Sequence, residues 1–142
     1  MKLTILFTLI LTAMTTLVSA QGPSQTELKK AEMKKLEKMA GQWKGSGWIQ
    51  QGPKRETFSG TETVQTKLDG LATLVEGNFA NSEGKAIHQT LAVLSYDDAK
   101  KNYRFATYLA NGISNVQDFK IVGDHFEWGF EIPNFGTVRY TI

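Results

Sequence analysis

The sequence predicts a small antiparallel β-barrel of about eight strands, preceded by a short helix. From residue 41 onward, apolar and polar side chains alternate, and turn-forming residues recur at intervals of roughly 12 to 17 residues. The strands between these turns are long for a small sandwich but normal for a barrel. Consecutive hairpins predict an up-and-down meander, and we expect it to close on itself.

Seven turns separate the expected strands. They lie at residues 51–54, 69–70, 81–84, 97–102, 111–112, 123–124 and 133–136. Asp69-Gly70 and Asn111-Gly112 are the strongest signals, because two-residue hairpin turns need positive φ angles, which glycine adopts freely.

The first 20 residues have the pattern of a secretory signal peptide. Lys2 supplies the positive start, residues 3–18 are uncharged and largely apolar, and Ser19-Ala20 supplies small residues for cleavage. The apolar run is interrupted by threonines, among them Thr8, Thr12, Thr15 and Thr16, which favours a signal peptide over a membrane span. We therefore expect cleavage near Ala20, a periplasmic or secreted mature protein and no stable membrane anchor.

Composition excludes several classes of function. The chain has no cysteine, which rules out an acylated lipoprotein N-terminus, thiol catalysis and cysteine metal sites. Removing Lys2 from the 16 lysines and arginines leaves 15, against 14 aspartates and glutamates. This near-neutral balance provides no electrostatic footprint for nucleic acid, so we expect no nucleic-acid partner.

A helix is expected before the first strand. Residues 21–35 form a tether and the start of the helix, where Ser24 and Glu27 match a capping box. The helix should end near residue 40, at Gly41. Its apolar positions recur near helical spacing: Leu28, Ala31, Leu36 and Met39. The lysines between them alternate with glutamates, which favours a solvated face over a membrane or polyanion patch.

Aromatic residues dominate the side chains that strand alternation directs into the barrel. Glycines within the strands either leave space unfilled or allow the sheet to coil. Two alternatives stay open, because barrels of this strand number either fill their interior or hold one small ligand. The candidate ligand-binding residues are Trp43, Glu62, Phe79, Phe105, Phe126 and Trp128.

The two histidines are expected to lie outside the candidate site. Alternation in the fourth strand is assigned with Leu91 and Val93 inward, although Ala92 and Leu94 are also apolar. This assignment places His88 on the outer face, and His125 lies beside a turn. Neither histidine has a second ligand at metal-binding spacing, so no metal and no cofactor are expected.

Glu62 is the carboxylate that alternation places inside the barrel. An acid there is costly unless it is paired, and its pKa could rise enough for general acid or base work. A shift of one residue in register would instead place it in water. The sequence shows no Ser-His-Asp order, glycine-rich phosphate loop or metal-binding spacing, so no catalytic residue is assigned.

Gly41-Gln42-Trp43, at the passage from the helix into the first strand, resembles the Gly-x-Trp motif of lipocalins in the calycin superfamily. Together with Phe58-Ser59-Gly60 and Leu94-Ser95-Tyr96-Asp97, it makes residues 36–142 most similar to uncharacterised bacterial exported lipocalin-like domains. The resemblance implies a lipocalin-like barrel with Trp43 at its base. Members of that family usually continue through a further hairpin, so the end at Ile142 suggests a shortened chain.

The function expected from these observations is the binding of a small apolar or amphipathic molecule by an exported, non-enzymatic barrel. The lipocalin resemblance implies such binding, but the uncharacterised family implies no established activity. Two alternatives remain: a barrel enzyme that uses Glu62 as acid or base, and an interaction module that pairs through an open sheet edge.

Overall fold

The structure, a computed structural model, describes residues 22–51, 53–132 and 136–141. The expected signal peptide lies outside the described residues, as do residues 133–135 of the last expected turn. The helical elements are α1 (Gln25–Lys34), the 3-10 helix η1 (Glu37–Met39) and the 3-10 helix η2 (Leu68–Gly70). The strands are β1 (Gly41–Gln51), β2 (Lys54–Lys67), β3 (Ala72–Ala80), β4 (Ala86–Asp97), β5 (Asn102–Leu109), β6 (Ser114–Val122), β7 (His125–Ile132) and β8 (Gly136–Thr141).

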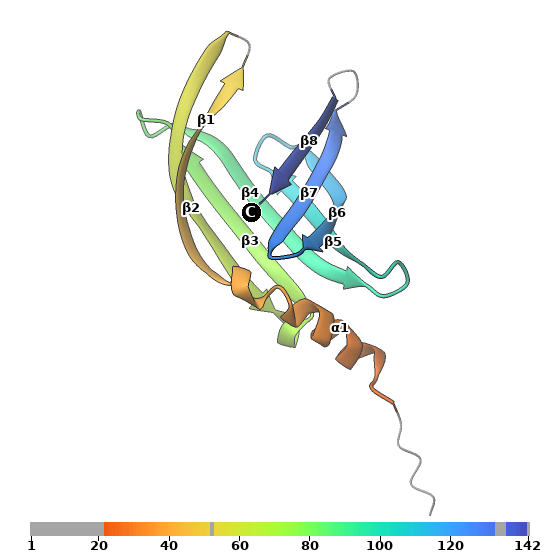
Figure 1. Cartoon of the computed structure of the whole chain (residues 1–142). Coiled ribbons are helices and arrows are strands. Elements are labelled where there is room, and N and C mark those ends of the chain that lie inside the picture. Colours follow the sequence, from red (N-terminus) through yellow and green to blue (C-terminus); the bar gives the residue numbers. More distant parts are fainter. Residues whose placement is uncertain (1–21, 52, 133–135, 142) are drawn as a thin grey trace, which may run out of the picture.

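The eight strands form one antiparallel sheet that curls into a half-barrel (Figure 1). Each strand pairs with its neighbours in sequence, from β1 with β2 to β7 with β8. The predicted up-and-down antiparallel fold is thereby confirmed. The expected closure is not made, because β1 and β8 lie at opposite ends of the strand order and do not pair within the described residues.

In the described chain, the strands end and begin on either side of the expected turns, but the two strongest signals form longer loops than predicted. At the first, Leu68, Asp69 and Gly70 all have positive φ angles, of 52°, 53° and 88°, so the loop includes η2. At the second, Leu109 N donates to the Ile113 carbonyl oxygen at 2.8 Å, which encloses Asn111 and Gly112 in a four-residue connection. The predicted two-residue geometry is therefore wrong at both turns, whereas the positive φ of each glycine is right.

The N-terminal helix is capped as predicted, but it follows a different path. Ser24 Oγ accepts a hydrogen bond from Glu27 N at 3.2 Å, which satisfies one of the free donors of the first turn. After Lys34 the α-helix ends, and the chain continues through η1. The buried positions are Met33, Leu36 and Met39. The expected inward positions Leu28 and Ala31 are exposed, because α1 turns the side that carries Met33 toward the sheet.

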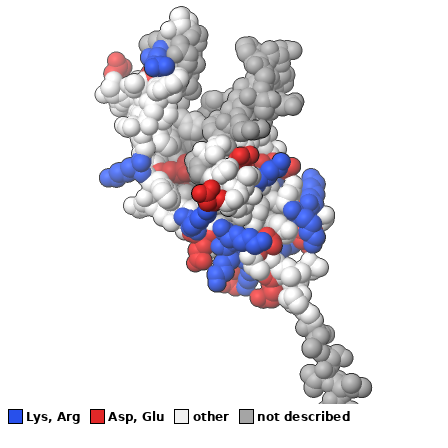
Figure 2. All heavy atoms as spheres, viewed as in Figure 1, with Lys and Arg blue, Asp and Glu red and all other residues white. Residues whose placement is uncertain are grey.

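Several helix lysines contact hairpin turns at one end of the half-barrel. Lys29 pairs with Asp98 at 3.0 Å and Lys30 with Asp69 at 2.5 Å. Lys38 Nζ donates to the Asp124 carbonyl oxygen at 2.8 Å. The expectation of a simply solvated face is therefore wrong for these lysines. Figure 2 shows charged side chains of both signs gathered over this helical end.

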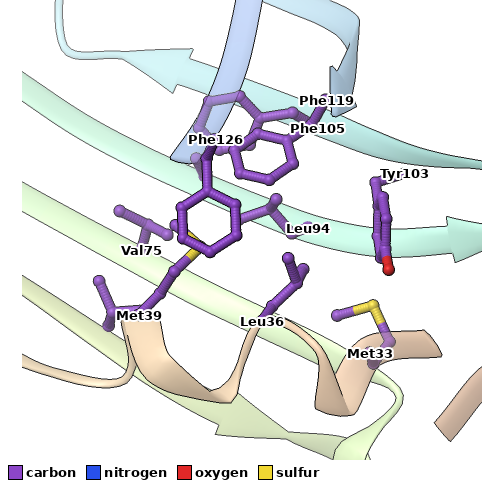
Figure 3. Packing of buried hydrophobic residues seen from close by; sticks show 11 residues of the cluster. Met33, Leu36, Met39, Val75, Leu94, Tyr103, Phe105, Phe119 and Phe126 are labelled. Atoms are coloured by element: carbon purple, nitrogen blue, oxygen red, sulfur yellow. The ribbon is translucent and has the colours of Figure 1, made fainter. Parts of the chain in front are cut away.

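The inner, concave face of the sheet is filled at the helical end by the hydrophobic core. Met33, Leu36 and Met39 rise from the helical segment to meet side chains of β2 to β7 (Figure 3). The strand residues of the core are Val64, Val75, Ala92, Leu94, Tyr103, Phe105, Phe119 and Phe126. We call this region the packed half of the concave face. Burial of these side chains contributes most of the attachment of the helix, since exposed ion pairs contribute about 0–1 kcal/mol each.

Candidate functional site

The concave face continues beyond the packed half into a region that the core does not fill. Residues directly opposite each other on antiparallel strands share a face, so the strand pairing extends this face from the core outward across β1 to β4. The side chains along it are Trp43, Phe58, Glu62, Phe79, His88 and Thr90. We call these six residues the open face. The Trp43 side chain is 52% exposed although it points to the concave side.

The aromatic side chains of the open face pack against strand glycines. A Cβ atom on Gly47 would lie 3.0 Å from Phe58 Cζ, and one on Gly60 would lie 2.7 Å from Phe79 Cα. The rings of Phe58 and Phe79 meet edge to face, with centroids 5.6 Å apart, which is a favoured geometry for aromatic pairs. The absence of side chains at these two glycines therefore allows the aromatic rings to lie close to the sheet.

Gly45 has a different environment from the glycines around it. Apart from its own chain neighbours, no atom of the described residues lies within 4 Å of the position that its Cβ would occupy, although its cross-strand partner Gly60 is tightly enclosed. Gly45 lies on the same face of β1 as Trp43. The described residues thus leave the concave side of β1 uncovered at Gly45, with room for another molecule beside the exposed Trp43 ring.

Polar groups converge over Gly77, in the centre of the open face. A Cβ atom on this glycine would lie 3.5 Å from Glu62 Oε2, 3.8 Å from Thr90 Cβ and 3.2 Å from Phe79 Cε2. Thr90 Oγ1 is also 2.5 Å from His88 Nε2. Because Gly77 has no side chain, the Glu62 carboxylate from β2 and Thr90 from β4 both approach the same position above β3, and His88 contacts Thr90.

Partial burial shifts the pKa values of Glu62 and His88. It raises the pKa of Glu62, because a low-dielectric environment disfavours the carboxylate. It lowers the pKa of His88, because the same effect disfavours the imidazolium. The His88 side chain keeps considerable solvent exposure, but one side of its ring lies against Phe79, with centroids 6.0 Å apart. At neutral pH this face therefore carries a neutral imidazole and an acid that is harder to ionise than usual.

The placement of His88 corrects the sequence-based register of β4. Ala92 and Leu94 are fully buried, whereas Leu91 is 44% exposed. The inward positions of this strand are thus the even-numbered ones, which include His88. Sequence alternation missed this because both faces of the strand carry apolar residues. The register between β3 and β4 also shifts between Phe79 and Ala80. The pairing of β4 therefore cannot be extrapolated from the turn that precedes it.

The six predicted ligand-binding residues fall into two groups. Trp43, Glu62 and Phe79 lie in the open face. Phe105 and Phe126 are buried in the packed half, 7% and 5% exposed, and Trp128 packs against them. The structure also brings Phe58, His88 and Thr90 into the open face. Among these three, the inward position of Phe58 follows from the alternation of β2, whereas the other two depend on the register of β4.

Trp43 connects the open face to the helical end. Its indole Nε1 donates a hydrogen bond to the Met39 carbonyl oxygen at 2.9 Å. Met39 itself belongs to the core. The hydrogen bond fixes one edge of the Trp43 ring, while the exposed remainder stays available for contact.

Other candidate features lie outside the open face. His125 is 3.1 Å from a Glu127 carboxylate oxygen, and this contact raises the pKa of His125. A shallow pocket of about 220 Å³ lies between α1 and the adjoining ends of β2 and β3, where Met33, Thr66 and Thr73 line it. Within residues 22–51, 53–132 and 136–141, no group of three or more histidine, aspartate or glutamate side chains is arranged to hold a metal ion. No helix in the same ranges is long and apolar enough to cross a membrane.

Comparison with protein families identifies the group to which this half-barrel belongs. The model of a family described as "Protein of unknown function (DUF1579)" matches residues 28–116. The chain belongs to the DUF1579 family. The DUF1579 match runs from α1 into β6 and includes all six residues of the open face. No curated protein and no solved structure matches the chain.

Proposed function

We propose that the open face binds a small amphipathic molecule and that the protein is an exported relative of the lipocalins. The export rests on the signal-peptide pattern of residues 1–20. The kinship rests on Gly41-Gln42-Trp43 together with the curled antiparallel meander. Binding rests on the geometry of the open face, in which aromatic rings surround a small polar cluster, a combination typical of small-molecule sites.

The observation that carries the binding proposal is the uncovered space at Gly45 beside a half-exposed indole. A tryptophan ring that points to the inside of a curled sheet would normally be covered by other side chains. A ligand that covered Trp43 would gain about 25 cal/mol for each Å² of apolar surface removed from water. The packed half supplies a rigid base for this site, because its own side chains already fill the other end of the concave face.

Blocking the space at Gly45 should weaken binding strongly without disturbing the fold. We expect Gly45→Leu to weaken the binding of the neutral fluorescent probe N-phenyl-1-naphthylamine by about tenfold or more, since the leucine side chain would occupy the ligand space. Titration of probe fluorescence measures this affinity. The matched control is Ser46→Leu, which adds the same side chain on the outer face of β1, where Ser46 is exposed.

The two leucine variants separate site occlusion from general effects on the sheet. Wild-type protein and Ser46→Leu should bind the probe alike. Equal binding by Gly45→Leu and wild type, or no binding by wild type, would contradict the proposal.

A second candidate function is strand pairing with a partner protein. It is favoured by the open strand order, in which β1 has β2 on one side and no strand on the other within the described chain. Exposed edge strands offer unpaired backbone groups to an added strand. If this is the function, amide hydrogens of β1 that exchange rapidly in the isolated protein should become protected when a partner is bound. Unchanged exchange in β1 would exclude edge pairing with that partner.

A further inference from the structure

We propose that the polar group of the bound molecule is an alkylammonium, held by the Glu62 carboxylate with the rings of Trp43 and Phe79 beside it. This inference rests on the proposed function and specifies its ligand class. It depends on two independent features: the sign of the charges on the concave face, and the arrangement of aromatic rings around the carboxylate.

The ionisable groups of the concave face favour a cation. Where the strand side chains are described, the charged or ionisable groups on this face near the site are Glu56, Glu62 and His88, and no lysine or arginine accompanies them. Glu56 already accepts a hydrogen bond from Asn81 Nδ2 at 2.8 Å. Glu62 has no hydrogen-bond or ion-pair partner among the described residues. It is therefore a partly buried acid without a counter-charge, which a cationic ligand would supply.

The neighbouring basic side chains lie on the other side of the sheet. Lys44 alternates with Trp43 and Gly45 along β1 and so points outward. Arg55 lies over the ring of Trp48, with its guanidinium carbon 3.8 Å from the ring centroid. Both Arg55 and Trp48 lie on the outer face, as the pairing of Trp48 with Thr57 shows. Neither basic residue neutralises Glu62.

Aromatic rings flank the Glu62 carboxylate on two sides. Trp43 is the direct cross-strand partner of Glu62, so their side chains are neighbours on the same face. On the other side, Glu62 Oε2 and Phe79 Cε2 both approach the empty position above Gly77. A carboxylate with aromatic rings beside it is a favourable environment for an ammonium group, because the face of an aromatic ring attracts a cation.

The remaining polar groups are compatible with a cation. Because burial lowers the pKa of His88, its imidazole is neutral at neutral pH and does not repel a positive charge. Thr90 Oγ1 can accept a hydrogen bond from an N–H donor. A carboxylate head group would instead meet the ionised Glu62 without a basic partner, and an alcohol would gain a hydrogen bond without the charge attraction.

The experiment compares four ligands that share an octyl tail and differ in the head group. Isothermal titration calorimetry at neutral pH would measure octylammonium, octyltrimethylammonium, octanol and octanoate with wild-type protein, Glu62→Gln and Glu76→Gln. Glu76 is an exposed carboxylate on the outer face of β3, so its variant is a matched control for loss of one negative charge. We expect wild type and Glu76→Gln to bind both ammonium ligands about tenfold or more tightly than octanol, with octanoate weakest.

Glu62→Gln should lose the preference for ammonium ligands while retaining its affinity for octanol. The variant should remain folded, because glutamine removes a partly buried charge without changing the size of the side chain. Retention of the full ammonium preference by Glu62→Gln would overturn the head-group proposal. Equal binding of all four ligands by wild type would also overturn it, although the proposed binding function would stand. If wild type binds none of these ligands and also fails to bind N-phenyl-1-naphthylamine, both proposals are wrong.

The pH dependence provides an independent test. Octyltrimethylammonium keeps its charge at every pH, so any change in its affinity comes from the protein. As the pH falls through the raised pKa of Glu62, the carboxylate gains a proton and affinity should decrease. Protonation of His88, whose pKa is lowered by burial, places a positive charge on the same face and also decreases the affinity. Glu62→Gln should lack the decrease that protonation of Glu62 causes, and an identical pH profile in the two proteins would contradict the role of Glu62.

Discussion

Phe119→Ala is expected to lower the free energy of unfolding by about 3–5 kcal/mol, the usual range for removing a buried phenylalanine. Phe119 is 1% exposed. Its ring lies 5.5 to 6.4 Å, between centroids, from the rings of Tyr103, Phe105, Phe126 and Trp128. Alanine would remove the shared member of all four aromatic pairs and leave a cavity in the packed half. Urea unfolding followed by circular dichroism would measure the change.

Val116→Ala provides the control on the same strand. Val116 is 51% exposed and lies on the outer face of β6, so its truncation should change the free energy of unfolding by no more than about 0.5 kcal/mol. Similar losses in the two variants would show that Phe119 is not the centre of the core.

Gly60→Ala is the second substitution with a large expected effect, about 3 kcal/mol of destabilisation or more. The added Cβ would lie 2.7 Å from both Cα and Cδ1 of Phe79. The first of these atoms belongs to the backbone of β3, so a change of side-chain rotamer cannot relieve the contact. Relief requires β2 and β3 to separate, which would weaken their pairing. Denaturant unfolding measures the loss, and amide exchange in β2 and β3 shows where it occurs.

Gly45→Ala tests whether this effect depends on the local space rather than on glycine itself. Gly45 is the cross-strand partner of Gly60, but beyond its chain neighbours no described residue has an atom within 4 Å of its Cβ position. Alanine there should leave the free energy of unfolding within about 0.5 kcal/mol of wild type. Comparable destabilisation by both alanines would contradict the described packing of β2 against β3.

The general fold could be predicted from local sequence signals because those signals act over a few residues. Turn residues mark each chain reversal, and Ser24 with Glu27 marks the start of the helix. Glu62 could also be placed correctly, since Phe58 and Val64 give β2 one clearly apolar face. By contrast, the open edge depends on whether β1 comes close enough to β8 to pair with it. Local alternation within each strand contains no information about the distance between these two strands.

The candidate site could be predicted only in part. In β4, apolar residues occupy both faces, so alternation alone cannot choose between Leu91 and Leu94. The choice is made by contacts with Val75 and Phe105 on neighbouring strands. His88 and Thr90 follow that choice and therefore escaped prediction. Contacts between residues far apart in the sequence also explain why the expectation that Lys29 and Lys30 are solvated was wrong. In the structure they form ion pairs with aspartates in distant turns.

The division of the concave side of the sheet into the packed half and the open face has an evolutionary consequence. Residues that hold the fold together, such as Leu36 and Phe119, are fully buried at the helical end. Residues such as Gly45 and His88 have open space or solvent beside them. Substitutions at these open positions can therefore change the shape and polarity of the face at little expense in stability. A single inherited scaffold could in this way acquire different ligand preferences through a few changes around β1 and β4.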